Sequence, residues 1–147
     1  MSSLIIPTPC NDLRIGSEML IYDNSCRITE LTKAKTGKHG SAKAHFKGID
    51  IFTDRKYEFH ATTSDKIDVP EIIKNEYQLI DIDNGTVSYL DNEGNIKDDL
   101  KMPDLSDSDN KLAIDLCNTF NNTKDADIFI NVISFREVSA IKGFRVK

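Results

Sequence analysis

Alternating apolar and polar positions predict a protein built mainly of β-strands. Eight short segments, rich in branched or aromatic residues and bounded by turn residues, are expected to be strands: Glu18–Tyr22, Cys26–Thr32, Ala42–Ile51, Lys56–Ala61, Tyr77–Ile82, Thr86–Leu90, Ile96–Lys101 and Asp127–Ser134. Asn84-Gly85 separates two of them, and both residues tolerate the positive φ of a tight hairpin turn. With a second reversal at Asp91–Gly94, residues 77–102 should form a three-stranded meander.

A helical period appears only near the middle of the second half. Leu112, Leu116 and Phe120 recur every four residues and would form the apolar stripe of a helix. Ser106 or Ser108 can cap its N-terminus, and Asn121-Asn122 should end it. Three strands, a helix and a further strand follow in the order expected of an oligonucleotide-binding (OB) barrel.

A change of composition at Asp68-Val69-Pro70 predicts a domain boundary, because proline interrupts strand pairing. Residues 1–70 carry a net charge of +1, whereas residues 71–147 carry −6. The first segment has about five expected short strands and no clear helix, which suggests a small SH3-like barrel. The predicted fold is therefore mainly β, with an N-terminal SH3-like barrel at 1–70 followed by a C-terminal OB-fold barrel with one helix at 71–147.

Composition narrows the classes of function. No apolar run approaches the ~18 residues that span a bilayer, so no membrane span is expected. The 3 cysteines, Cys10, Cys26 and Cys117, are odd in number and far apart, which favours a reducing, cytoplasmic location over a disulfide framework. His39, His45 and His60 are too scattered to define a metal site. The paired carboxylates lie at expected turns and at the helix start, so they do not indicate an enzyme.

The segment from Leu31 to Ile49 holds five lysines and no carboxylate, in a chain of net charge −5. Its centre joins two expected strands as a long hairpin connection, and Gly37 and Gly40 place Lys38 where a side chain is easily presented. Three interpretations follow from the residues: a solvated basic loop, a presented amine, or a contact with RNA phosphates. A nucleotide-binding P-loop is excluded, because Thr32 stands at its first glycine position and His39 at its magnesium-binding hydroxyl position.

The loop belongs to a pattern that extends along nearly the whole chain. It begins with Lys35-Thr36-Gly37-Lys38-His39-Gly40-Ser41-Ala42-Lys43, followed by Gly48-Ile49-Asp50-Ile51-Phe52-Thr53 and Lys56-Tyr57-Glu58. It continues with Asp68-Val69-Pro70, Tyr77-Gln78-Leu79-Ile80, Glu93-Gly94 and Asp98-Asp99-Leu100, and Cys10, Leu13-Arg14 and Cys26-Arg27-Ile28 fit the same register. This pattern resembles eukaryotic translation initiation factor 5A, the family of hypusine-containing factors, and its Lys-Thr-Gly-Lys-His-Gly block is highly specific.

The resemblance implies a fold, a modification and a set of partners. It implies the same SH3-like and OB barrels, and it makes Lys38 the residue that deoxyhypusine synthase modifies with an aminobutyl group from spermidine. Deoxyhypusine hydroxylase would then complete the hypusine, so no separate cofactor is expected. Lys35, Thr36, Gly37, His39 and Gly40 would form the modification loop. The lysines expected near RNA are Lys33, Lys35, Lys43 and Lys47.

The implied function is that of a non-catalytic translation factor. Family members bind the ribosome, its rRNA and the peptidyl-tRNA, and the hypusine reaches toward the peptidyl-transferase centre. They promote elongation by relieving stalls, for example at consecutive prolines, and they assist termination. Unmodified members tend to pair, so a weak homodimer is also expected.

A different class of function remains open from the residues. The chain would then be a general single-strand RNA-binding or RNA-export adaptor that uses the OB domain and the basic loop without modification. Tyr77, Tyr89 and Phe129 could stack bases on an OB surface, although a place in the strand core is the more usual role for such aromatics.

Overall fold

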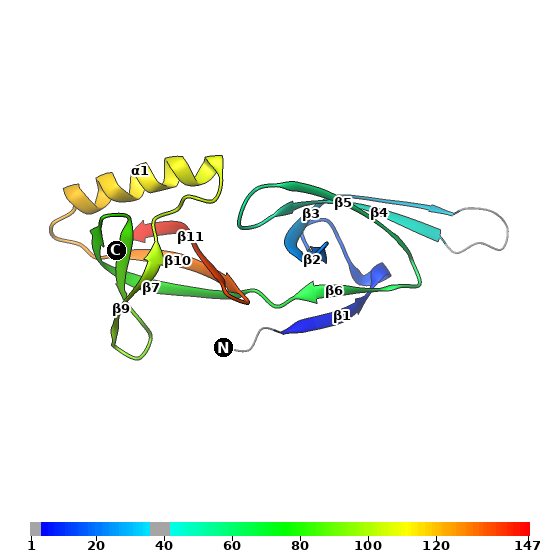
Figure 1. Ribbon diagram of the computed structural model, residues 1–147, viewed down its shortest axis with the longest axis horizontal. Helices are drawn as coiled ribbons and strands as arrows, with labels where there is room; N and C mark the ends of the chain where they lie inside the picture. The colour runs from blue at the N-terminus through cyan, green and yellow to red at the C-terminus, as the bar shows by residue number, and fades with distance from the viewer. Residues whose placement is uncertain (1–3, 36–41) are drawn as a thin grey trace. The chain divides into compact units, whose positions relative to one another are not determined.

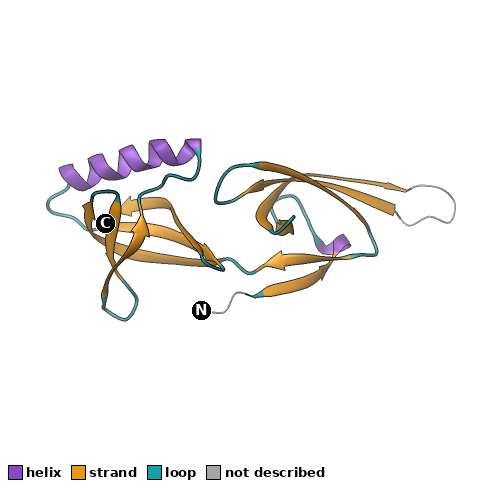
Figure 2. Cartoon of the chain, viewed as in Figure 1, coloured by secondary structure: helices purple, strands orange, loops and turns teal. Residues whose placement is uncertain are grey.

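The computed structural model describes residues 4–35 and 42–147, and the chain divides into two compact units, Met1–Glu71 and Ile72–Lys147 (Figure 1). Each unit is mainly β, and the second carries α1, the α-helix of the described residues (Figure 2). The predicted fold class is confirmed. All eight predicted strands overlap strands of the structure.

The first unit contains a curled antiparallel sheet in the order β2-β3-β4-β5 and a separate antiparallel ladder of β1 and β6. The bounds are β1 Ile5–Pro9, β2 Glu18–Ile21, β3 Asn24–Lys35, β4 Ala42–Asp50, β5 Lys56–Thr62 and β6 Lys66–Pro70, with a short 3₁₀ turn at Cys10–Asp12. Strand β2 contacts β6, so the ladder covers one side of the curled sheet.

Strand β4 has the alternation of buried and accessible residues that its sequence predicted. Ala44, Phe46 and Gly48 are buried on the side that we call the inner face, where Ala44 and Phe46 join the core with Met19 and Ile28. The residues between them lie on the opposite side, the outer face, because successive side chains of a strand point to opposite sides. Each outer-face residue of β4 remains at least partly accessible.

Strands β1 and β6 were not predicted. Pro7 and Pro9 lower the strand signal of β1, and Pro70 was expected to interrupt pairing. Instead Pro70 is the last paired residue of β6, opposite Ile5. Both strands belong to a two-stranded ladder, and a proline is tolerated at such an edge because its missing N–H can face away from the partner.

The second unit is a five-stranded antiparallel sheet in the order β11-β10-β7-β8-β9. Its elements are β7 Ile73–Asp83, β8 Thr86–Leu90, β9 Ile96–Lys101, α1 Asp107–Asn122, β10 Ile128–Phe135 and β11 Val138–Val146. β11 also contacts β9, which brings the two edges of the sheet together around a core that includes Val87, Ile130 and Ile141. Asn84 and Gly85 have φ values of 56° and 81°, as the predicted hairpin turn requires.

The helix begins and ends as predicted. Ser106 is its N-cap, and its hydroxyl accepts a hydrogen bond from the Asp109 amide at 3.3 Å. Leu116 is fully buried, and Leu112 and Phe120 are partly buried.

A buried ion pair ties the helix to β11. The Lys142 Nζ lies 3.0 Å from Asp109 Oδ1 and donates to that carboxylate, whose side chain is only 3% exposed. Asp109 Oδ2 also accepts a hydrogen bond from the Leu105 amide at 3.0 Å. The buried carboxylate of Asp109 therefore binds both Leu105, just before the helix, and Lys142 on β11.

Strand β11 was not predicted, and a β-bulge accounts for this. Asn131 of β10 pairs with Gly143 and Val132 pairs with Ile141, which leaves Lys142 as an extra residue in the ladder. The extra residue breaks the two-residue period that marks a strand in a sequence. The bulge at Lys142 also lets that side chain turn toward the helix and meet Asp109.

Candidate nucleic-acid interface

The predicted modification loop falls largely outside the described residues. Thr36, Gly37, Lys38, His39 and Gly40 lie in the gap between Lys35 and Ala42. The structure does describe the two strands that bound this gap. Lys35 is the last residue of β3, and its backbone pairs with that of Ala42, the first residue of β4.

The β3–β4 hairpin is the longest strand pair of the first unit. Its ladder runs from Cys26 opposite Asp50 to Lys35 opposite Ala42, with a register shift between Ile28 and Glu30. Strand β5 supports β4 from Ile49 to Lys43. The ends of the connecting loop therefore emerge from a continuous, laterally supported sheet.

Gly48 lies at a closely packed point of this hairpin. A Cβ atom at this position would lie 3.0 Å from Cys26 Cβ, 3.1 Å from Ile21 Cδ1 and 3.3 Å from the Arg27 carbonyl oxygen. Close approach of three strands at this position requires a residue without a side chain.

We expect Gly48→Ala to destabilise the protein by about 1–3 kcal/mol, because the methyl group forces packed neighbours apart. Urea denaturation measures the change. Gly143→Ala is the matched control, since its Cβ would meet only the flexible Asn131 amide at 3.3 Å and the neighbour can move aside. An equal loss in both variants would show that Gly48 has no special packing role.

Two of the predicted RNA-contacting lysines are exposed and lie on opposite faces of the sheet. Lys43 is on the outer face of β4, opposite Ala34 on β3 and Thr62 on β5. Lys33 is opposite the buried Ala44, so it belongs to the inner face beyond the core. Its Nζ donates a hydrogen bond of 3.3 Å to Asn11 Oδ1 in the 3₁₀ turn. The two ammonium groups therefore serve different sides of the hairpin.

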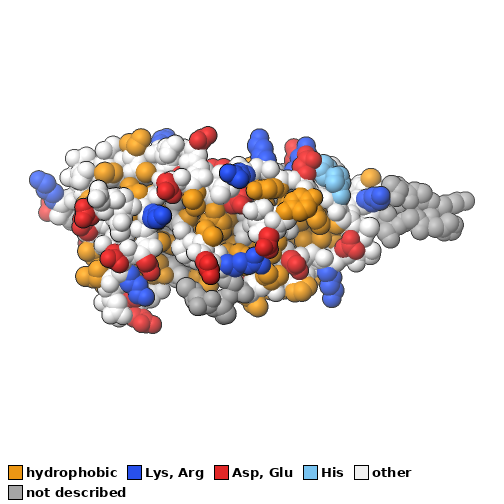
Figure 3. Space-filling view, in the orientation of Figure 1, with side chains coloured by type: hydrophobic (Ala, Val, Ile, Leu, Met, Phe, Trp, Pro, Cys, Tyr) orange, Lys and Arg blue, Asp and Glu red, His pale blue; other side chains and the backbone are white. Residues whose placement is uncertain are grey.

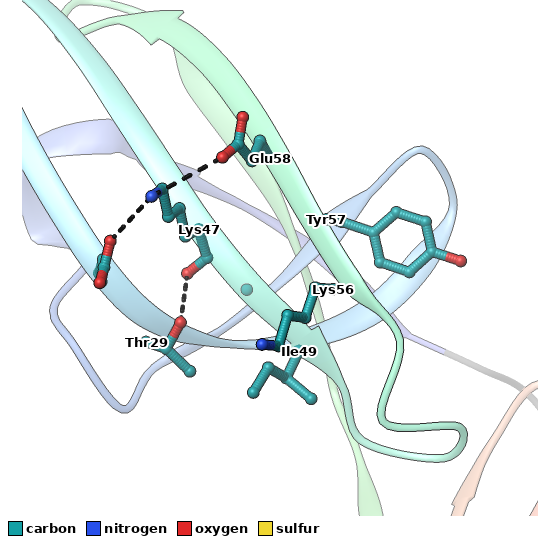
Figure 4. Close-up of a pocket in the computed structure, with 8 residues that line it drawn as sticks. Thr29, Lys47, Ile49, Lys56, Tyr57 and Glu58 are labelled. Carbon is teal, nitrogen blue, oxygen red and sulfur yellow. Dashed lines mark hydrogen bonds and ion pairs between the residues drawn. The ribbon is translucent and has the colours of Figure 1, made fainter. Parts of the chain in front are cut away.

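Lys47 differs from these two because carboxylates from both neighbouring strands reach it. Its Nζ lies 3.2 Å from Glu30 Oε2 on β3 and 3.8 Å from Glu58 Oε1 on β5 (Figure 4). The three residues stand opposite one another in the sheet register and form one row across the outer face. The positive charge of Lys47 is thus compensated within the sheet.

A shallow hollow of about 330 Å³ lies beside this row. It is lined by Thr29, Glu30, Lys47, Gly48, Ile49, Lys56, Tyr57 and Glu58. The Thr29 hydroxyl donates to the Lys47 carbonyl oxygen at 3.1 Å and fixes the backbone at the register shift.

A stacked pair of imidazoles lies next to the row. The rings of His45 on β4 and His60 on β5 are 4.2 Å apart between centroids and nearly parallel, at 3°. His45 Nε2 lies 3.7 Å from Glu58 Oε2, which is too far for a hydrogen bond, and this buried nitrogen has no hydrogen-bond partner. Figure 3 shows the histidines as a pale-blue patch beside Lys and Arg and Asp and Glu side chains.

The two cysteines of this unit are structural. Cys10 and Cys26 are fully buried, and neither forms a disulfide. Burial, followed by the negative charge of Asp50, raises the pKa of Cys26 to about 12. Burial is also the main reason that the pKa of Cys10 is raised. Both thiols therefore stay protonated and unreactive at neutral pH.

Tyr77, Tyr89 and Phe129, the aromatic residues considered for base stacking, each contact another side chain of the second unit. Tyr89 is only 6% exposed, and its ring packs on that of Tyr77 at 4.8 Å between centroids. Its hydroxyl donates to Asp99, and burial with this hydrogen bond raises the pKa of the phenol. Phe129 lies under the Arg145 guanidinium at 5.3 Å. The faces of these rings are therefore in contact with Tyr77, Tyr89 or Arg145 of the same unit.

Sequence reasoning missed the carboxylates that compensate Lys47. Glu30 lies just before the carboxylate-free segment Leu31–Ile49, and Glu58 lies after it. Neither residue therefore enters the charge of that segment. Pairing the predicted strands in register would have placed both beside Lys47, because cross-strand neighbours lie within about 5.5 Å. The stacking of His45 on His60 follows from the same register.

Among residues 4–35 and 42–147, no group of three histidine, cysteine, aspartate or glutamate side chains could hold a metal ion. Within the same ranges, no helix has both the length and the apolar character needed to cross a membrane.

Two family models match successive parts of the chain. The model "Translation initiation factor 5A-like, N-terminal" matches residues 3–65. The model "Eukaryotic elongation factor 5A hypusine, DNA-binding OB fold" matches residues 71–145.

Individual proteins match over most of their length. Eukaryotic translation initiation factor 5A-1 of Saccharomyces cerevisiae is 36% identical over 144 residues, which cover 98% of this chain and 87% of the yeast protein. Eukaryotic translation initiation factor 5A-3 of Arabidopsis thaliana is 41% identical over 134 residues, 90% of this chain and 81% of the plant protein. The solved structure of an eif-5a family protein from Naegleria fowleri has a TM-score of 0.86 at 38% identity, and covers 97% of this chain and 98% of that one.

Proposed function

The chain belongs to the translation initiation factor 5A family, and on this premise we propose that it is a cytoplasmic, ribosome-binding factor that acts through hypusine formed on Lys38. It would promote elongation through difficult sequences, such as consecutive prolines, and assist termination. The partners of this proposal are the rRNA and peptidyl-tRNA of the ribosome, together with deoxyhypusine synthase and deoxyhypusine hydroxylase. A weak homodimer of the unmodified chain belongs to the same proposal.

The observation that carries the proposal is the position of Lys38 in the sequence pattern that resembles the family. The residue stands in Lys35-Thr36-Gly37-Lys38-His39-Gly40, between the two longest paired strands of the first unit. The two strands that bound the loop pair without a break from Glu30 to Lys35, and β5 supports β4. A supported hairpin suits a residue whose side chain must be delivered to a fixed position on a partner.

Charge on the hairpin supports a sequence-independent contact with RNA. Lys33 and Lys43 are exposed on its opposite faces, so phosphates on either side would meet an ammonium group. Such contacts position a protein on RNA without reading bases. Conversion of Lys38 to hypusine would lengthen its side chain and add a second amine, which an unmodified lysine does not have.

We expect intact-mass analysis of the protein from its native source to show an added mass located on the peptide that contains Lys38. The reason is the transfer of an aminobutyl group from spermidine, followed by hydroxylation. Peptides containing Lys33, Lys43 and Lys47 serve as internal controls and should carry no such addition. An unmodified Lys38 peptide from growing cells would contradict the proposal and favour an unmodified RNA-binding adaptor.

A further inference from the structure

We propose that the row Glu30–Lys47–Glu58 limits how far RNA phosphates contact the outer face of the hairpin, and that the pair His45–His60 makes this limit dependent on protonation. The inference rests on the proposed contact of this hairpin with RNA, and it concerns only described residues. It assigns to the row and to the histidine pair a role in RNA binding that differs from that of Lys38.

The first step is the charge of the row. Two carboxylates and one ammonium group leave it with a net charge of −1, since Lys47 is paired with both Glu30 and Glu58. The side chains of the row are 45–64% exposed, so their field reaches the solvent. A phosphate that follows β4 away from Lys43 therefore meets the two carboxylates beside Lys47 before it reaches Arg27 and Lys56, which pair with Ile49 on the same face.

The second step is the order of residues along the outer face. Lys43, His45 and Lys47 follow one another on β4, and same-face residues of a strand are spaced by about 6.6 Å. On the side of the row that leads to Lys35 and Ala42, the described outer-face residues of β3, β4 and β5 are Thr32, Ala34, Lys43, His45, His60 and Thr62. None of these is a carboxylate. Asp65 lies just after β5, where its Oδ2 accepts a hydrogen bond from the Thr62 amide.

The third step is the response of the histidine pair to a proton. Around His45 stand Thr32 on β3, His60 and Glu58 on β5, and Lys43 and Lys47 on its own strand. Two charged rings at a centroid distance of 4.2 Å would repel each other. A positive charge on His45 would face Glu58, whose Oε2 lies 3.7 Å from His45 Nε2.

Protonation then changes what an approaching phosphate meets. With neutral histidines the row and the pair together carry −1, and with one proton they carry no net charge. The carboxylates of the row then no longer repel a phosphate bound at Lys43. The contact of RNA with β4 can extend from Lys43 to His45, a distance of about 6.6 Å. RNA affinity should therefore rise on acidification through the range in which histidine titrates.

The experiment uses the full chain and a fluorescent polyuridine oligonucleotide as the probe, at low salt, at about pH 8 and at about pH 6. We expect the affinity of the unchanged protein to be roughly two- to fivefold higher at the lower pH. The double variant His45→Gln, His60→Gln should lose most of this difference. His39 is unchanged in both proteins.

Glu58→Gln tests the row independently of the histidines. We expect it to raise the affinity at about pH 8 by roughly two- to fivefold, because the row becomes neutral without a proton. Asp68→Asn is the matched control: it removes one exposed carboxylate of the same unit, on β6, outside the hairpin sheet. Glu30→Gln should act as Glu58→Gln does, which protects the conclusion against a folding defect in either variant.

The inference is overturned if Glu58→Gln and Glu30→Gln gain no more affinity than Asp68→Asn, or if the double histidine variant keeps the full pH difference. It is also overturned if the unchanged protein does not bind the oligonucleotide at either pH. The mass analysis of Lys38 is independent of these outcomes, so the modification and the RNA contact can fail separately.

Discussion

Replacing Lys38 with arginine is expected to abolish the relief of stalling at consecutive prolines. Arginine keeps the positive charge of the loop, but its guanidinium cannot receive the aminobutyl group that converts lysine to hypusine. Expression of a reporter with consecutive prolines, relative to one without them, should fall roughly tenfold or more, as expected when a positioned group is lost. The measurement requires cells in which this chain is the only factor of its family.

Lys43→Arg is the matched control for this substitution. It makes the same chemical change on the same hairpin, at an exposed position that the structure describes. We expect the control to support the reporter nearly as well as the unchanged protein. Normal expression of the proline reporter with Lys38→Arg would show that charge alone suffices and would refute the hypusine mechanism.

Replacing Asp109 with alanine is expected to have the largest effect on stability. The substitution removes the carboxylate that accepts hydrogen bonds from Lys142 and from the Leu105 amide, and it leaves the partly buried ammonium without this partner. Breaking a buried ion pair by removing one partner costs about 3–5 kcal/mol. Because the Lys142 side chain is 20% exposed and can reach water, we expect a loss of about 3 kcal/mol, at the lower end.

Urea denaturation followed by the helical circular dichroism signal measures this loss, because α1 is the α-helix of the described residues and lies in the second unit. Asp107→Ala is the control, since it removes an exposed carboxylate from the same helical turn and should cost no more than about 1 kcal/mol. Asp109→Leu combined with Lys142→Met should recover part of the lost stability, since no charge remains buried. A loss below about 1 kcal/mol for Asp109→Ala would mean that the pair is not needed to hold the helix.

The sequence predicted the elements whose signals are local. The turn at Asn84-Gly85, the cap at Ser106 and the alternation along β4 each depend on residues within a few positions, and the structure has all three. Strands β1 and β6 escaped prediction because their pairing is distant in the chain and their prolines are acceptable only at an edge. β11 escaped because of the bulge at Lys142.

The residues of the candidate site also differ in whether their surroundings could be predicted from the sequence. The composition of Leu31–Ile49 directed attention to the hairpin, and the family pattern singled out Lys38. Composition could not distinguish Lys43 from Lys47, because the difference lies in partners on other strands. Lys47 is held between Glu30 and Glu58, whereas Lys43 faces Ala34 and Thr62. Only the sheet register brings these neighbours together.

The bulge at Lys142 also has a consequence for how the strand can change in evolution. Before it, the odd-numbered Ile141 points into the barrel, and after it the even-numbered Phe144 faces the buried Ile130. Lys142 is thus an extra residue between two regularly paired parts of β11. Its deletion would leave Ile141 and Phe144 on the face of the strand that contacts the core. A deletion elsewhere in β11 would move a part of the strand out of phase with β10. The helix contact and the apolar core therefore occupy separate positions in the same strand.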